Sequence, residues 1–171
     1  MRYPIGPEPQ APAVTREARE ASIVVIDALP QRLREAVDAL TADQLDTPYR
    51  PGGWTLRQVV HHLADSHLNG YVRLKLALTE EAPTIKPYDE RLWANLPDSA
   101  MPLDPSLALL EGVHARWTAL YRAMPDEDFL RTFHHPERQE RLTLERHLHL
   151  YAWHSRHHVA HITQLRDRQR W

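Results

Sequence analysis

Apolar side chains recur every three or four residues in four long segments of the chain, the spacing of helices that bury one face. The predicted helices span residues 15–40, 55–78, 104–123 and 143–168. Few stretches alternate apolar and polar residues, so strands are expected to be a minor part of the structure. Four long amphipathic helices in one chain predict an all-α fold, a four-helix bundle.

Local signals mark the ends of these helices. Thr55 is followed three residues later by Gln58, which predicts a capping box at the start of the second helix. Asp104 directly precedes Pro105, which predicts Asp104 as the N-cap of the third helix. Pro30 lies inside the first predicted helix, where we expect a kink or a break.

A long connection separates the second and third predicted helices. Residues 79–103 contain four prolines, and one helical turn is expected near residues 88–94. Loops of this length in compact domains often have a function. A turn or small hairpin is expected in the stretch FHHPERQERL. The whole chain, residues 1–171, is predicted to form one domain with a Pro-rich extended arm at residues 1–13.

Composition narrows the classes of function. The chain has 171 residues and a net charge of -2, so it lacks the basic excess with which proteins neutralise nucleic-acid phosphates. No apolar run is long enough to cross a bilayer and the first residues do not resemble a secretory signal, so we expect a cytoplasmic protein without membrane association. Cysteine is absent, so nitrogen and oxygen atoms must hold any metal.

Histidine is concentrated in the last predicted helix. Six of the chain's twelve histidines lie in the stretch HLHLYAWHSRHHVAHI. A helix turns by about 100° per residue, which places His147, His154, His158 and His161 on one face. His154 and His158 are four residues apart and can reach one metal ion from adjacent turns, and His157 and His161 have the same spacing. The glutamate of a zincin helix is missing, which excludes that class of protease.

A metal site needs at least a third ligand from elsewhere in the chain. The second predicted helix offers two polar stripes. One stripe consists of Gln58, His62, Ser66, Asn69 and Arg73, and the other of Arg57, His61, Asp65 and Lys75. One stripe is expected to face water and the other a polar pocket inside the bundle, and periodicity alone does not decide which.

Other interpretations of these residues stay open. The histidine-rich face is also compatible with a solvated surface, or with a proton relay or pH sensor. The more isolated histidines are interpreted as surface or hydrogen-bonded structural residues: His114, His134, His135 and His149. Trp54, Trp117 and Trp153 are expected in the core, whereas Trp93, in the long connection, is expected to line a pocket.

Five stretches together resemble the YfiT-like branch of the DinB superfamily, whose members are described as metal-dependent hydrolases. These stretches are YPIG, YRPGGWTLRQVVHHLADSHLNGYVRLKLALTEE, PYDERLW, LLEGVHARWTAL and LYAWHSRHHVAHI. The likeness extends over nearly the whole chain, from Tyr3 to Trp171.

The resemblance implies a bundle with up-down-down-up topology, which would account for the long connection after the second helix. It implies one divalent ion per chain, held by His62, His154 and His158, with zinc the ion usually assigned and nickel the alternative. It also implies that the stripe of Gln58, Ser66 and Asn69 faces the pocket. Members of this branch are cytoplasmic homodimers, and the same is expected here.

Three neutral imidazoles leave at least one position on a metal open, as in catalytic rather than structural sites. The first hypothesis is a hydrolase that activates water at the metal. The second is an S-transferase for bacillithiol or another low-molecular-weight thiol, which the metal would hold as thiolate. Both enzymes would act on a small-molecule substrate. The third is a metal-binding bundle without catalysis.

Roles for the remaining polar residues are less defined. Asp65, Glu145 and His161 are candidates for a general acid or base. His157 and His161 are also expected to hold the second ring nitrogen of the ligating imidazoles, which normally needs a partner. Because ligating histidines must be neutral, the ion is expected to leave as the pH falls below roughly 6.

Overall fold

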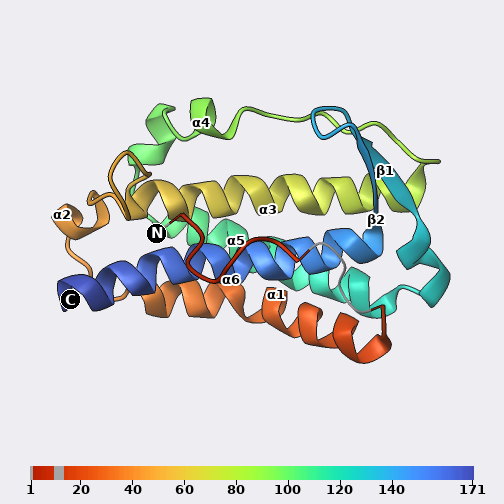
Figure 1. Ribbon diagram of the computed structural model, residues 1–171, viewed down its shortest axis with the longest axis horizontal. Coiled ribbons are helices and arrows are strands. Elements are labelled where there is room, and N and C mark those ends of the chain that lie inside the picture. The colour runs from red at the N-terminus through yellow and green to blue at the C-terminus, as the bar shows by residue number, and fades with distance from the viewer. Residues whose placement is uncertain (1, 10–13) are drawn as a thin grey trace.

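Four long helices form a bundle in the computed structural model, which describes residues 2–9 and 14–171 (Figure 1). They are α1 (Arg16–Val37), α3 (Leu56–Thr79), α5 (Asp104–Ala123) and α6 (Leu144–Gln169). Helices α1 and α6 run in one direction along the bundle and α3 and α5 in the other (Figure 1). The expected all-α bundle and its up-down-down-up order are therefore confirmed.

Helices α1 and α3 pack on the same two partners. Helix α1 contacts α5 and α6, and α3 contacts α5 and α6 as well. The two helices that contain most of the histidines, α3 and α6, are therefore direct neighbours. Among the described helices, none combines the length and the apolar character needed to cross a membrane.

The long connection exists because α3 and α5 run in parallel. The chain must return from the end of α3 to the opposite end of the bundle before α5 begins (Figure 1). On the way it forms the short helix α4 (Glu90–Trp93), where one turn was predicted, and the 3-10 helix η1 (Pro97–Ala100). The Asp89 carboxylate caps α4 by accepting from the N–H groups of Arg91 and Leu92. A further short helix, α2 (Ala42–Leu45), joins α1 to α3.

A small hairpin fastens the start of this connection. After the 3-10 helix η2 (Asp126–Leu130), strands β1 (Thr132–His135) and β2 (Glu140–Thr143) pair antiparallel, as the FHHPERQERL stretch predicted. The N–H of Ile85 donates to the His134 carbonyl at 3.1 Å, and the N–H of His134 donates to the Pro83 carbonyl at 2.8 Å. The connection is thus tied to β1 before it returns along α3.

The described part of the N-terminal arm, residues 2–9, lies along α6. The Gln164 side chain donates to the Pro4 carbonyl at 3.1 Å, and Arg146 pairs with Glu8 at 2.9 Å. The predicted arm spans residues 1–13, of which residues 1 and 10–13 lie outside the described residues.

The predicted N-cap of the third long helix was wrong. Helix α5 begins at Asp104 itself, and the cap residue is Leu103, whose carbonyl accepts from Leu107 at 3.0 Å. Leu103 is buried, so packing extends the helix one residue beyond the polar signal. At Pro30 the sequence predicted a kink or a break, and the break does not occur, because helix α1 is continuous through this residue. Buried side chains on both sides of Pro30 hold the helix in place, and only one backbone hydrogen bond is lost. The capping box of Thr55 and Gln58 is present.

The apolar core consists of two clusters. One surrounds the fully buried Trp117, which confirms the prediction for that residue, and the other is built on leucines such as Leu63 and Leu110. On α6 the first cluster ends at Ala152 and the second resumes at Ile162. The histidine-rich part of α6 therefore lies between the two clusters.

Gly70 on α3 allows a close contact with α5 and α6. A Cβ atom at this position would lie 2.6 Å from Cη2 of Trp117 and would also meet the Tyr151 ring. Gly70→Ala is therefore expected to lower the free energy of unfolding by about 1–3 kcal/mol, because two buried aromatic rings must shift. Urea denaturation of the purified variant measures this change.

Gly112 on α5 provides the matched control. A Cβ atom there would have no neighbour within 4 Å. Gly112→Ala should stabilise the protein by about 0.5–1 kcal/mol, because alanine is a better helix residue. Equal effects of the two substitutions would contradict this account of the α3–α5–α6 packing.

Candidate metal centre

Three histidine side chains from two helices meet between α3 and α6. Nε2 of His154 lies 3.1 Å from Nε2 of His158 and 3.4 Å from Nε2 of His62. His154 and His158 are brought together by one helical turn, and His62 comes from the neighbouring helix. One ligand nitrogen of each residue lies within 4.8 Å of the others, so the structure brings together the three residues implied by the resemblance.

The separations suit a divalent metal. Two imidazole nitrogens bound to zinc at about 2.0–2.1 Å and at a tetrahedral angle are about 3.3 Å apart. The two closest pairs here, at 3.1 and 3.4 Å, match that value. Three nitrogen donors suit zinc or nickel and leave at least one coordination position for another group.

Burial keeps the three imidazoles in the form that binds metal. It lowers the pKa of His62 to about 4, and it lowers the pKa of His154 and of His158 well below 6.5. The charges that neighbouring histidines would acquire act in the same direction. All three rings are therefore neutral near pH 7, with a lone pair available for a cation.

A cavity of about 610 Å³ opens beside the three histidines, and we call it the metal cavity. Its aromatic wall is formed by Tyr3, Tyr49, Trp54 and Trp153, and its charged wall by Arg2, Arg50, Arg91 and Glu90. The Trp54 ring packs on the His62 ring with 4.6 Å between centroids, which restricts the orientation of that imidazole. The site is therefore rigid on one side and accessible to a small molecule on the other.

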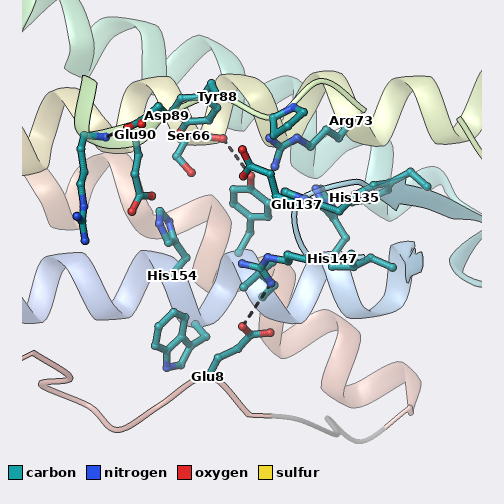
Figure 2. Close-up of a pocket in the computed structure, with 18 residues that line it drawn as sticks. Glu8, Ser66, Arg73, Tyr88, Asp89, Glu90, His135, Glu137, His147 and His154 are labelled. Atoms are coloured by element: carbon teal, nitrogen blue, oxygen red, sulfur yellow. Dashed lines mark hydrogen bonds and ion pairs between the residues drawn. The ribbon is translucent and has the colours of Figure 1, made fainter. Parts of the chain in front are cut away.

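A second cavity, of about 530 Å³, also borders His154 (Figure 2). We call it the hairpin cavity, because His135, Glu137 and Arg138 of the hairpin line it. The two cavities share four wall residues: Glu90, Arg91, Trp153 and His154. In Figure 2 the side chain of Glu90 points toward His154. A carboxylate from α4 thus lies in the wall of both cavities, beside an imidazole of the candidate metal site.

The predicted polar stripe of α3 faces the site only in part. Gln58 lines the metal cavity and donates to the Ala94 carbonyl at 2.8 Å, which holds the end of α4 against α3. Ser66 lines the hairpin cavity. Asn69 instead donates to the backbone carbonyl of Asp65 at 2.9 Å and lies in neither wall.

The acid and base candidates lie mostly elsewhere. Asp65 is in neither wall, and burial together with the nearby Asp98 raises its pKa to about 6. Glu145 is buried in an ion pair with Arg19 at 2.6 Å. His161 does line the metal cavity. Among the described residues, Glu90 is the acidic side chain in the wall of that cavity.

His157 and His161 contact each other rather than the second nitrogens of the three ligand candidates. Their Nε2 atoms are 3.0 Å apart, and both rings line the metal cavity. The second ring nitrogen of His154 is held by His67 instead, with 3.0 Å between His154 Nδ1 and His67 Nε2. The sequence gives no local signal for this contact, because His67 and His154 are 87 residues apart.

The tryptophans are distributed between the core and the cavity walls differently from the prediction. Trp153 lines both cavities and stacks on His157, so its assignment to the core was wrong. Trp54 packs against the leucine-rich cluster and also lines the metal cavity. Trp93 packs on Tyr88 with 4.4 Å between ring centroids and lies in neither cavity wall.

The other two histidines of α6 have structural partners. His147 is fully buried, and its Nδ1 is 2.7 Å from the Tyr121 hydroxyl; burial lowers its pKa to about 3. His149 lies 2.8 Å from the Ser22 hydroxyl and 3.1 Å from Glu145, away from the metal cavity. His147 therefore does not join the other histidines of its predicted face at the candidate site.

Comparison with known proteins agrees with this geometry. The profile of the DinB superfamily matches residues 26–162. YfiT of Bacillus subtilis, named a "putative metal-dependent hydrolase", is 53% identical over 173 residues, which cover 100% of this chain and 97% of that protein. The chain belongs to the DinB superfamily.

A second relative and a solved structure extend the match within the DinB superfamily. A protein of Bacillus cereus with the same description is 53% identical over 171 residues, covering 100% of this chain and 98% of its own. The solved structure of B. subtilis YfiT superposes with a TM-score of 0.96 over 99% of this chain and 98% of that one. That structure is described as "a probable metal-dependent hydrolase with an unusual four-helix bundle topology".

Removal of a ligand should abolish metal binding without unfolding the bundle. We expect His62→Ala and His154→Ala to lose the bound divalent ion, because each variant leaves only two of the three nitrogens. His149→Ala is the control, since its ring contacts Ser22 and Glu145 instead. Elemental analysis of untagged protein after zinc loading and dialysis measures the ion. Equal zinc content in all three variants would refute the assignment.

Metal binding should persist to a lower pH than ordinary histidines would allow. Protons compete with the metal only below the pKa of the metal-free ligand, and burial lowers that of His62 to about 4. Zinc affinity should therefore be nearly constant from pH 8 to about 5.5 and fall steeply between about pH 5 and 4. This places release below the value of roughly 6 expected from sequence. Competition with a chelator across this range measures the affinity, and a midpoint above pH 6 would contradict burial as the cause.

Proposed function

We propose that the protein is a metal-dependent hydrolase of a small anionic substrate, with one divalent ion held by His62, His154 and His158. The observation that carries the proposal is the junction of this three-nitrogen site with an open cavity. The description of its relatives as metal-dependent hydrolases supports the same reaction class. Zinc is the proposed ion, with nickel as the alternative for three imidazoles.

An ion bound there would supply the usual chemistry of such sites: it lowers the pKa of a water ligand and polarises the bond to be cleaved. The protein contributes the remaining steps. Glu90 is placed to accept the proton of the attacking water, because its carboxylate shares the cavity wall with all three histidines. The water oxygen bonds to the carbonyl carbon, the bond to the leaving group breaks, and the leaving group takes up the proton.

The charges of the metal cavity favour an anionic substrate. Arg2, Arg50 and Arg91 line it, against the single carboxylate of Glu90. Within the described residues, none of these three guanidinium groups has an acidic partner within 4.0 Å. Unpaired arginines beside a cation attract carboxylate or phosphate groups and orient them by paired hydrogen bonds.

The function is tested with pairs of substrates that differ only in charge. Zinc-loaded protein is incubated with N-acetyl amino acids and with their neutral N-methylamides, and the released amine is quantified. Cleavage that requires the metal and favours the carboxylate form is expected. A parallel incubation contains monochlorobimane and bacillithiol. Thiol conjugation without any cleavage would refute the hydrolase proposal in favour of a thiol transferase. The absence of both reactions would favour a metal-binding bundle without catalysis.

Loss of the Glu90 carboxylate should separate catalysis from metal binding. Glu90→Gln is expected to lower kcat by about 10²-fold or more, because the attacking water loses its proton acceptor. Zinc content should be unchanged, since Glu90 is not among the ligands. Glu137→Gln is the matched control, as this carboxylate lines only the hairpin cavity. Equal rates for Glu90→Gln and the unmodified protein would eliminate Glu90 as the base.

A further inference from the structure

A backbone carbonyl of α1 lacks its usual helical partner. The N–H of residue 30 would normally donate to the carbonyl of Ile26, but Pro30 has no N–H. Ile26 is fully buried, so its carbonyl needs a donor from inside the protein. His114 of α5 fills this position, with Nδ1 at 2.6 Å from the carbonyl oxygen.

A line of three imidazoles leads from this carbonyl to the metal centre. Nε2 of His114 lies 2.9 Å from Nδ1 of His67, and the two ring planes are 11° apart, which suits a hydrogen bond between their edges. Nε2 of His67 in turn lies 3.0 Å from Nδ1 of His154. Each imidazole therefore uses both nitrogens, and the last contact reaches a residue of the candidate metal site.

The carbonyl fixes the direction of every hydrogen bond in this line. A carbonyl only accepts, so Nδ1 of His114 must donate, and its Nε2 has a lone pair when the ring is neutral. Nδ1 of His67 must then donate to that lone pair, which leaves Nε2 of His67 as an acceptor. Nδ1 of His154 must donate to it in turn, which leaves Nε2 of His154 without a proton.

The bare nitrogen is the one that faces the metal. Nε2 of His154 is the atom that lies 3.1 and 3.4 Å from Nε2 of His158 and His62. We propose that His67 and His114 are positioning residues: together with the Ile26 carbonyl, they hold His154 in the tautomer that offers Nε2 to the ion. The proposal rests on the metal site but is independent of the reaction catalysed there.

Burial supports the neutral state that this deduction requires. His67 and His114 are almost completely enclosed, and both contact the Trp117 ring at its edge. Burial lowers the pKa of His114, at the start of the line, to about 4. By contrast, Nδ1 of His158 is buried without a hydrogen-bond partner among the described residues. Of these two ligand candidates, His154 is therefore the one whose second ring nitrogen is held by a hydrogen bond.

Nuclear magnetic resonance tests the tautomer directly. Long-range ¹H–¹⁵N correlation of histidine-labelled, metal-free protein at pH 7.5 distinguishes a protonated from a bare ring nitrogen. His154 should show a protonated Nδ1 and a bare Nε2, and His67 and His114 should show the same pattern. A protonated Nε2 on His154 in the unmodified protein would overturn the proposal, whatever the enzyme does.

Substitution of His67 tests its effect on the ion. His67→Leu removes both hydrogen bonds at similar volume, so His154 should lose its fixed tautomer and zinc affinity should fall by about 10–100-fold. His67→Gln can restore the direction, because its amide oxygen accepts from His154 and its amino group donates to His114. It should recover most of that loss. Zinc affinity is measured by chelator competition, with circular dichroism to confirm folding.

His61→Leu is the matched control on the same helix. His61 is also buried and also makes two hydrogen bonds, to the Ser106 hydroxyl at 2.8 Å and the Met101 carbonyl at 3.1 Å, but it does not reach the metal centre. The His61→Leu variant should therefore keep both the zinc affinity and the His154 tautomer of the unmodified protein. If His61→Leu weakens zinc as much as His67→Leu, or if His67→Leu leaves both readouts unchanged, the positioning role is refuted.

Discussion

The hydrogen bond from His114 to the Ile26 carbonyl determines the direction of the buried hydrogen bonds that lead to the metal centre. Each imidazole nitrogen between α1 and the metal centre can either donate or accept a hydrogen bond, depending on which ring atom holds the proton. The Ile26 carbonyl can only accept, so it sets the direction of the other hydrogen bonds. The bond exists because Pro30 removes the helical donor that would otherwise occupy this carbonyl. A residue expected to disturb the first helix thus leaves that helix intact and supplies an acceptor to the centre of the bundle.

Topology explains why the site is both enclosed and open. The parallel run of α3 and α5 forces the chain to cross the length of the bundle between them, and this crossing brings α4 to the cavity beside α3 and α6. The helices supply the rigid imidazoles, whereas the connection supplies Glu90 and Arg91. In this arrangement the helices hold the ligands and a connecting segment carries the other reactive groups. It suits catalysis, because packing sets the ligand geometry while the cavity wall can vary.

Local rules predicted the parts of the structure that depend on neighbours in sequence. The helices, the capping box at Thr55 and the four-residue spacing of His154 and His158 all follow from periodicity. The choice of His62 came from the resemblance, since two polar stripes on α3 were equally compatible with the pattern. The contacts of His67 and the position of Glu90 link residues that are distant in sequence, and no spacing rule encodes them. Trp153 was misplaced for a similar reason, because a tryptophan on a helix packs equally well in a core or in a cavity wall.

The balance of charge distinguishes this site from a purely structural metal centre. A structural zinc site fills all four positions with protein ligands, and its surroundings exclude other molecules. Here three neutral nitrogens bring no negative charge, so a bound divalent ion would keep its full +2 charge beside three arginines that have no acidic partner among the described residues. Such a positive centre is stabilised by an anion, and the cavity provides the space for one. A set of three imidazoles as ligands therefore argues for a site whose charge is completed by what it binds, with Glu90 as the carboxylate of the cavity wall placed to move a proton there.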